Sequence, residues 1–201
     1  MDIQAAIDAL PTAGGVVLIP AGDHRADSPA SLLLRSNVRL VGAGMGLTTI
    51  PRIAGVSGRI YNVGLEDLSV ICSGGYAIDW RGVTSGSIKR VIANGGDYGL
   101  LGLSDCYYNV FENLFISAAN TGVEFSGNAN QNTFIGGKIS APIMVAEFSG
   151  CNGNTWVGTS LELGVPVSQI TWWKKASGGG LGSRMVNVRR EAANFGPDWL
   201  N

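Results

Sequence analysis

Apolar side chains return through the middle of the chain at a nearly constant interval of 22 to 23 residues. A first column of such positions comprises Leu65, Ile88, Phe111, Phe134 and Trp156. A second column, in phase with the first, comprises Trp80, Leu103, Phe125 and Phe148. A fixed period of this length is typical of a solenoid, in which each coil buries its apolar face against the neighbouring coils. The pattern therefore predicts a stack of short coils.

The segments between these columns alternate apolar and polar residues with a period of two, and Gly, Asn and Ser separate them. Clear examples are residues 65–70, 111–116 and 122–125. This pattern favours short strands joined by tight turns and leaves no room for helices. Leucine-rich repeats have a similar length, but their fixed spacing of Leu and Asn is absent. We therefore predict an all-β fold, a parallel β-helix whose rungs of 22–23 residues stack about 4.8 Å apart.

Asparagine follows the same interval. Asn109, Asn132 and Asn154 each lie two residues before an aromatic member of the first column. Equivalent residues of successive rungs are neighbours in a β-helix, so we expect these amides to bridge the turns.

The two ends of the chain differ from the repeats. Ile3, Ala6, Ile7 and Leu10 have helical spacing, and Pro11 ends the segment, which predicts a short amphipathic helix that caps the solenoid. Near the other end, residues 177–183 are rich in Gly and Ser. We therefore divide the chain into a β-helix with its cap (residues 1–176, cap 1–11) and a glycine-rich joint with a C-terminal tail (177–201).

The opening of the chain also carries a family resemblance, over residues 3–9, 14–22 and 36–44. The run Gly14-Gly15-Val16-Val17-Leu18-Ile19-Pro20-Ala21-Gly22 is its clearest part. This succession resembles the start of the pectate-lyase-like superfamily, which includes pectinases and bacteriophage tailspikes. His24 departs from the pattern, because the family often has an aromatic residue there. The resemblance implies a right-handed parallel β-helix, closest in character to tailspike-like proteins, and says little about activity, because it rests on capping and turn chemistry.

Charge excludes several classes of function. Charged residues make up only 14% of the chain, against roughly 25% in an average soluble domain. The net charge is -1 and the basic residues are scattered, so we expect no nucleic-acid partner and no membrane-binding patch. The start has no signal-peptide core. A surface with so little charge favours burial against a partner or against copies of the chain itself.

Cysteine and histidine spacing indicates neither metal nor disulfide. The chain has three cysteines, of which Cys106 and Cys151 fall two predicted rungs apart, roughly 9 to 10 Å, which is too far for a disulfide. We interpret all three, Cys72 included, as reduced structural thiols. No spacing suits zinc, so we expect no metal site and no cofactor.

One set of carboxylates is a candidate for catalysis. Asp79, Gly102, Glu124 and Glu147 each precede a predicted second-column position, so the carboxylates are expected to point outward. Glu124 and Glu147 would then lie about 4.8 Å apart, near the roughly 5 to 5.5 Å of retaining glycosidases. Any outward column gives such a spacing, and the polygalacturonase motifs are absent. We therefore favour no catalytic residues, with Glu124, Glu147 and Asp79 as the alternative for a polysaccharide hydrolase or lyase.

A second set of charged residues has a structural interpretation. Glu66, Lys89 and Glu112 recur at the rung interval, as do Asp67, Arg90 and Asn113. Opposite charges on adjacent strands predict salt ladders between rungs.

The C-terminal region is rich in aromatic residues. The candidate interface residues are Trp172, Trp173, Phe195, Trp199 and Leu200. Large aromatic side chains beyond a flexible joint are typical anchors at interfaces. The alternative is that the tail folds back as the C-terminal cap of its own solenoid.

These observations support three hypotheses. The first is a non-enzymatic virion protein, made in the host cytoplasm: a tailspike-like β-helix, expected to be a homotrimer, that decorates or cements a phage capsid or serves as a small tail or fibre component. Tailspikes usually have an N-terminal head, whereas this chain begins with its cap, so the β-helix and tail are expected to make the attachment unless the chain is a fragment. The second is the polysaccharide depolymerase of a tailspike. The third is a carbohydrate-binding module that uses Tyr107, Tyr108 and Trp80.

Overall fold

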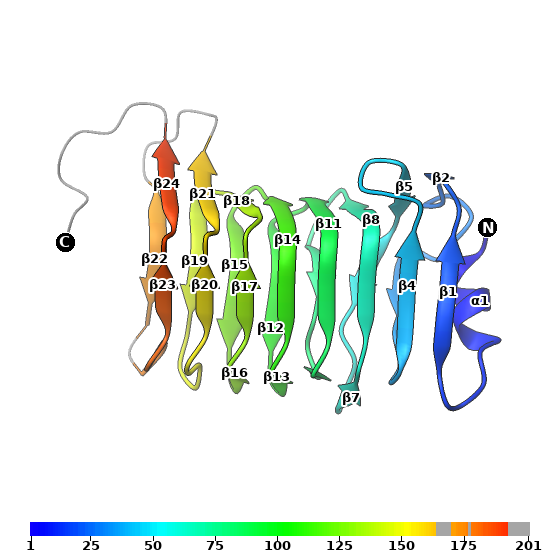
Figure 1. The fold of residues 1–201 in the computed structure, drawn as a ribbon, viewed down its shortest axis with the longest axis horizontal. Helices are drawn as coiled ribbons and strands as arrows, with labels where there is room; N and C mark the ends of the chain where they lie inside the picture. Colours follow the sequence, from blue (N-terminus) through cyan, green and yellow to red (C-terminus); the bar gives the residue numbers. More distant parts are fainter. Residues whose placement is uncertain (164–169, 177, 193–201) are drawn as a thin grey trace.

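The chain is described here by a computed structural model, which places residues 1–163, 170–176 and 178–192. These residues form one helix, α1 (Ile3–Asp8), and strands in three parallel sheets (Figure 1). Along the stack, sheet A contains β1 (Gly15–Ile19), β4 (Val38–Gly42), β8 (Gly64–Cys72), β11 (Ser87–Gly95), β14 (Val110–Ser117), β17 (Thr133–Ile135), β20 (Thr155–Val157) and β23 (Arg184–Val186). Sheet A also includes β2 (Gly22–Asp23), β5 (Thr48–Ile50), β18 (Lys138–Ser140), β21 (Ser160–Leu163) and β24 (Arg189–Ala192).

Two further sheets complete each coil. Sheet B contains β3 (Ser31–Leu33), β6 (Arg52–Ala54), β9 (Tyr76–Asp79), β12 (Tyr98–Leu103), β15 (Thr121–Ser126), β19 (Ile143–Glu147) and β22 (Thr171–Lys175). Sheet C contains β7 (Ile60–Tyr61), β10 (Val83–Thr84), β13 (Cys106–Tyr107) and β16 (Ala129–Asn130).

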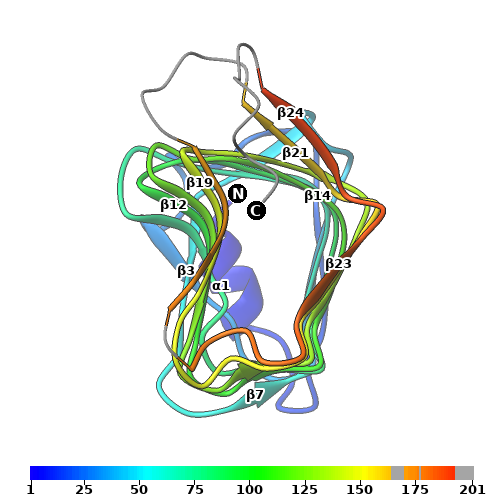
Figure 2. The same cartoon turned by 90° about the vertical axis from the view of Figure 1, so that its left-hand side faces the viewer.

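The coil is right-handed. In Figure 2 it is seen from its C-terminal end, and the chain runs counter-clockwise from sheet A to sheet B and then to sheet C while it advances toward the viewer. The expected all-β, right-handed parallel β-helix is confirmed. Strands β23 and β24, which lie in the segment predicted as joint and tail, pair with β20 and β21 and extend sheet A. The proposed division at residue 176 stays a prediction.

The N-terminal cap forms as its sequence indicates. Ile3 and Ile7 of α1 are fully buried against the first coil. The carboxylate of Asp2 accepts a hydrogen bond from the Ala5 amide at 3.1 Å, which satisfies one of the free donors at the start of the helix. Arg35 donates to the Leu10 and Pro11 carbonyls just beyond the helix. Arg35 therefore fixes the C-terminal end of α1 to the solenoid.

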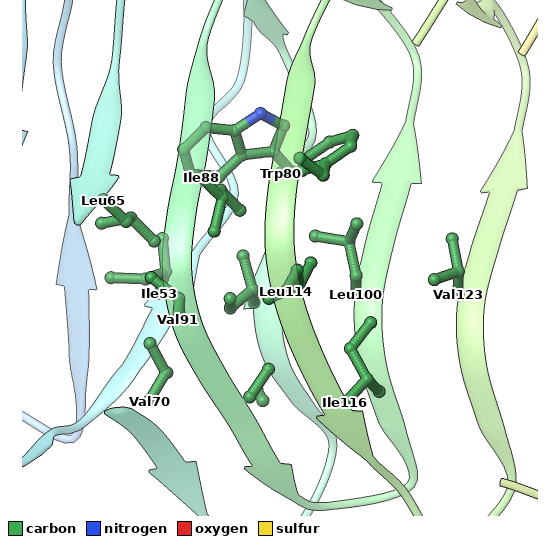
Figure 3. Close-up of a cluster of buried hydrophobic side chains, with 14 of the residues drawn as sticks. Ile53, Leu65, Val70, Trp80, Ile88, Val91, Leu100, Leu114, Ile116 and Val123 are labelled. Carbon is green, nitrogen blue, oxygen red and sulfur yellow. The ribbon is translucent and has the colours of Figure 1, made fainter. Parts of the chain in front are cut away.

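The first apolar column is a continuous ladder inside the coil. Strand pairing aligns Leu40 with Leu65, Leu65 with Ile88, and so on through Phe111, Phe134 and Trp156. The rings of Phe111 and Phe134 stack at 4.5 Å, and those of Phe134 and Trp156 at 5.4 Å. Such a pair contributes about 0.5–1.5 kcal/mol beyond its buried area. Figure 3 shows part of this core, with Leu65 and Ile88 of sheet A and Leu100 and Val123 of sheet B among the labelled side chains.

The predicted second column is wrong by one residue at two positions. Strand pairing aligns Gly102 with Phe125, and Phe125 with Glu147, whereas Leu103 aligns with Ser126. A Cβ on Gly102 would lie 2.4 Å from the Phe125 ring, so the ring fills the place that a side chain would take. The inward position of this rung is therefore a glycine, which a search for apolar residues does not find.

A left-handed residue bends sheet A in successive rungs, at the corner visible between β23 and β24 in Figure 2. The residues at this corner are Asp67, Arg90, Asn113, Gly136, Gly158 and Asn187. The expected salt ladder occupies the same corner. Arg90 pairs with Asp67 at 2.6 Å and with Glu66 at 2.5 Å, and Lys89 lies 3.9 Å from Glu112.

Candidate functional site

Glu147 lies inside the coil, and its expected outward position is wrong. It is aligned with Phe125 and is 0% exposed. Its Oε1 accepts hydrogen bonds from Asn154 Nδ2 at 2.8 Å and from Ser183 Oγ at 2.9 Å. Its Oε2 accepts one from Trp173 Nε1 at 2.8 Å. Buried polar groups must be paired, and these three donors make Glu147 a structural tie between the last rungs.

The asparagine ladder leads directly to this carboxylate. Asn109 Nδ2 donates to Asn132 Oδ1 at 2.9 Å, and Asn132 Nδ2 donates to Asn154 Oδ1 at 3.0 Å. Asn109 and Asn132 also bond to the backbone of the preceding rung, at the carbonyls of Val83 and Cys106. The prediction that asparagine bridges the turns is confirmed.

Asp79 and Glu124 lie two rungs apart. Asp79 is aligned with Leu101, and Leu101 with Glu124, so roughly two strand spacings separate the carboxylates. Asp79 is nearly buried and forms a 2.5 Å ion pair with Arg81. The predicted trio of carboxylates is therefore not brought together, and its catalytic role stays a prediction.

Glu124 is partly buried near a lysine and a tyrosine. It is half-buried on β15, and its burial raises the pKa of its carboxyl, whereas the charge of Lys174 opposes this. The Glu124 carboxylate in turn raises the pKa of the nearby Tyr98 hydroxyl. Tyr98 packs on Tyr76, with ring centroids 5.1 Å apart.

A groove adjoins these tyrosines, and sequence reasoning did not find it. It consists of two pockets of about 240 and 280 Å³, both lined by Arg52. We call it the arginine groove. The remaining residues that line it are Arg25, Ala30, Pro51, Ile53, Ala54, Gly55, Ile71, Cys72, Ser73, Gly74, Tyr76, Asp79 and Arg81.

The three arginines of the groove differ in their partners. Arg25 bonds to Asp23 and lowers the pKa of that carboxyl to about 2, and Arg81 is paired with Asp79. Arg52 donates from Nε to Ser31 Oγ at 2.6 Å. Within residues 1–163, 170–176 and 178–192, no carboxylate forms an ion pair with Arg52. Arg52, which lines both pockets, thus has no ion-pair partner in that part of the chain.

Comparison with known proteins gives local sequence similarity and similarity of fold. No protein-family model matches the chain. Mannuronan C5-epimerase AlgE1 of Azotobacter vinelandii is 41% identical over 86 residues, covering 34% of this chain and 6% of the epimerase. Alginate lyase 7 of the same organism is 48% identical over 59 residues, covering 26% of this chain and 7% of the lyase. The chain therefore corresponds to a small part of these relatives.

Two solved structures are similar over most of the chain at low identity. ORF18 of Geobacillus virus E2 has a TM-score of 0.46 at 14% identity, covering 94% of this chain and 56% of that one. A putative glycosyl hydrolase of Parabacteroides merdae has a TM-score of 0.41 at 14% identity, covering 95% of this chain and 88% of that one. The cap helix, the three parallel sheets and the right-handed coil decide the fold. It is that of the pectate-lyase-like β-helices.

Two predicted interface residues lie on the last strand of sheet B in this β-helix. Trp173 packs at 5.5 Å on Trp156 and bonds to Glu147, so part of its surface serves the core. Trp172 is half-buried beside it. The other three, Phe195, Trp199 and Leu200, lie outside the described residues. An interface role for all five stays a prediction.

Other candidate groups are placed as follows. Trp80 is fully buried, so its expected use as an exposed sugar-binding aromatic is wrong, whereas Tyr108 is exposed.

All three cysteines are free thiols, and burial raises the pKa of Cys151 to about 11. Across the described part of the chain, no cluster of His, Cys, Asp and Glu is arranged to hold a metal ion. No helix in that part is long and apolar enough to cross a bilayer.

Proposed function

We propose that this chain is a non-enzymatic, tailspike-like β-helix of a phage particle, and that it holds an acidic polysaccharide in the arginine groove. Arg52 is the observation that carries the proposal, because this residue lines both pockets and its guanidinium has no carboxylate partner among the described residues. A guanidinium binds a carboxylate through two parallel hydrogen bonds. A sugar acid is a ligand of that chemistry.

The composition of the groove fits an extended sugar chain. Tyr76 lines one pocket as an aromatic wall, braced by Tyr98, and Ser73 lines the other pocket. Binding sites of this kind combine apolar walls with a few polar groups that fix orientation. The two pockets share Arg52, so a ligand longer than one sugar would place neighbouring units on either side of it.

The relatives support a polysaccharide ligand. Their names refer to mannuronan and alginate, which are polymers of uronic acids. The similarity covers about a third of this chain or less, so it supports the class of ligand and does not extend to the activity of those enzymes.

The placement of the carboxylates supports binding without cleavage. Glycoside hydrolysis needs two carboxyl groups on either side of one bond. Glu147 is enclosed in the core, and Asp79 is held by Arg81 two rungs from Glu124. On sheet B, Leu101 and Ala146 lie on either side of Glu124, and its charged neighbour is Lys174, two rungs away.

A purely structural role in the virion is the second candidate. In that role the β-helix decorates or cements the capsid, or forms part of the tail, and binds capsid or tail proteins. The column of exposed Ile135, Val157 and Val186 on sheet A favours it, because a contiguous apolar surface marks a protein contact.

Calorimetric titration with a mannuronate hexamer at low salt tests the first proposal. Wild type is expected to bind, and Arg52→Gln to bind at least tenfold more weakly, since hydrogen bonds to charged groups contribute about 1.5–3 kcal/mol. Arg39→Gln is the matched control on sheet A and is expected to bind within twofold of wild type. Maltohexaose, which has no carboxylates, is expected not to bind. Equal affinity of wild type and Arg52→Gln would overturn the proposal.

A further inference from the structure

The two pockets of the arginine groove differ in charge. The larger one, of about 280 Å³, is lined by Arg25 and Arg52, and no carboxylate is among the described residues that line it. The smaller one, of about 240 Å³, is lined by Arg52, Arg81 and Asp79. Asp79 therefore gives the smaller pocket an anion that the larger pocket does not have in its described wall.

The charge of Arg52 acts on the larger pocket. Its Nη1 lies 3.3 Å from the place that a Cβ on Gly75 would take, next to Gly74 of the pocket wall. Burial raises the pKa of the Cys72 thiol in the same wall, and the charge of Arg52 opposes this rise. A ligand in the larger pocket therefore meets the Arg52 cation.

Two carboxylates near the larger pocket have partners outside it. Asp23 is bonded through both oxygens to Arg25, at 2.9 and 2.6 Å. Asp97 accepts a hydrogen bond from the Gly75 amide at 3.3 Å. Neither carboxylate lines the pocket, so Arg52 is available there to the carboxylate of a ligand.

The smaller pocket contains an ion pair of its own. The Asp79 side chain is 7% exposed, and its Oδ1 lies 2.4 Å from the place that a Cβ on Gly55 would take, so the carboxylate packs on the Gly55 backbone in the pocket wall. Arg81 donates to Asp79 Oδ2 from Nη2 at 2.5 Å and to Oδ1 from its backbone amide at 3.1 Å. Arg81 is therefore already engaged with a carboxylate.

We infer that Asp79 determines which sugar the smaller pocket accepts, and that the groove prefers a chain in which a sugar acid is next to a neutral sugar. This inference rests on the proposed function of the groove. The sugar acid occupies the larger pocket, with its carboxylate on Arg52. A second carboxylate in the smaller pocket would lie beside the charge of Asp79 and compete with it for Arg81, and like charges in one site weaken binding.

A neutral sugar fits the smaller pocket without that conflict. Its hydroxyl groups both donate and accept, so they can bond to the Arg81 guanidinium and to the Asp79 carboxylate together. The Tyr76 ring in the same wall offers an apolar surface to the face of the sugar ring. The ion pair that disfavours a second acid is therefore compatible with hydroxyl groups.

A matched set of disaccharides tests the inference. The set consists of the mannuronate disaccharide with two carboxylates, its two monomethyl esters with one each, and its dimethyl ester with none. Calorimetric titration of wild type at low salt is expected to show one monoester binding about threefold or more tightly than the diacid, and no binding of the diester. This comparison needs no variant, so it decides the question even where a substitution unfolds the protein.

Asp79→Asn removes the charge and keeps the shape of the side chain. It frees Arg81 for a second carboxylate, so the variant is expected to bind the diacid about fivefold more tightly than wild type does, with the affinity for the preferred monoester changed less than about twofold. A merely structural role of Asp79 would lower all affinities together. Asp105→Asn breaks a 2.7 Å ion pair with Arg59, outside the residues that line the groove, and as the matched control it is expected to bind as wild type does.

The results separate this inference from the proposed function. Wild type that binds the diacid at least as tightly as either monoester would overturn the inference, as would a folded Asp79→Asn variant with unchanged affinity for the diacid. Binding that still depends on Arg52 would then keep the proposed function. Failure of every ligand to bind, or equal affinity of wild type and Arg52→Gln, would overturn the proposed function and this inference with it. Circular dichroism establishes that each variant is folded.

Discussion

The side-chain amide of Asn154 donates a 2.8 Å hydrogen bond to the carboxylate of Glu147 inside the coil. This contact joins the asparagine ladder, which runs from rung to rung, to a carboxylate that also holds Trp173 and Ser183 of the last coil. A buried acceptor with three donors explains why a glutamate occupies an inward position among aromatic residues. It also removes Glu147 from any catalytic pair.

Loss of this carboxylate is expected to destabilise the protein strongly. Glu147→Ala leaves the donors of Asn154, Ser183 and Trp173 without their acceptor, at a cost of about 3 kcal/mol or more. Chemical denaturation measures the change in the free energy of unfolding. Glu112→Ala on the outer face, which loses only a long exposed ion pair, is the control and is expected to cost less than about 1 kcal/mol. Equal effects of the two substitutions would contradict the buried role of Glu147.

The middle of the asparagine ladder is expected to be equally sensitive. Asn132→Ala removes the acceptor of the Asn109 amides and the donor to the Cys106 carbonyl, at an expected cost of about 2–4 kcal/mol. Asn120→Ala, whose side chain bonds at the surface to Asp97, is expected to change stability by less than about 1 kcal/mol. Urea denaturation of both variants makes the comparison. A similar midpoint for the two would contradict the role of the ladder.

Gly158 lies at the sheet A corner and Gly137 directly follows it at Gly136, and the two distinguish the cost of backbone conformation from the cost of close packing. Gly137 has φ +74° and a Cβ there would lie 2.3 Å from the Leu114 carbonyl oxygen, whereas Gly158 has φ +63° and open space around it. Gly158→Ala is expected to cost about 1–2 kcal/mol for the left-handed conformation alone. Gly137→Ala adds a clash with backbone and is expected to cost clearly more. Thermal unfolding of the two variants checks the order, and a reversed order would contradict the packing described for this corner.

The dependence of stability on pH is expected to reveal the half-buried Glu124. Burial raises the pKa of its carboxyl in the folded state above the ordinary 4.5. The folded protein then binds the proton more tightly than the unfolded chain does, so this group makes stability fall as pH rises from about 4.5 through the raised pKa. Glu124→Gln removes the effect. Its stability relative to wild type is expected to be greater at pH 7 than at pH 4, by denaturation at both pH values, and the opposite trend would contradict the burial of Glu124.

The sequence predicts the sheet A core well because each inward position of that column is a large apolar residue, from Leu65 to Trp156. Sheet B is harder, since Gly102 occupies an inward position and lets the Phe125 ring fill the space. A search for apolar residues then shifts to Leu103 and Phe148. A shift of one residue moves a side chain to the other face of a strand, and Glu147 was misplaced for that reason.

The arginine groove could not be predicted from the repeat. Ile53 pairs with Ile78, an interval of 25, and this longer rung takes Arg52 and Tyr76 out of the regular spacing. The groove arises where rungs of unequal length meet. Arg52 stands out in it because it lines both pockets and has no carboxylate partner among the described residues, and only the structure reveals these two facts.

The most direct test of the account is a proton NMR time course of a mannuronate hexamer with the wild-type chain. We predict that the sugar signals broaden or shift in proportion to the protein added, and that no new anomeric or unsaturated-sugar signals appear over prolonged incubation. New signals from cleaved or epimerised sugar would contradict a non-enzymatic groove, and Glu124→Gln would then be the first variant to assay. Sugar signals that neither shift nor broaden would contradict polysaccharide binding itself.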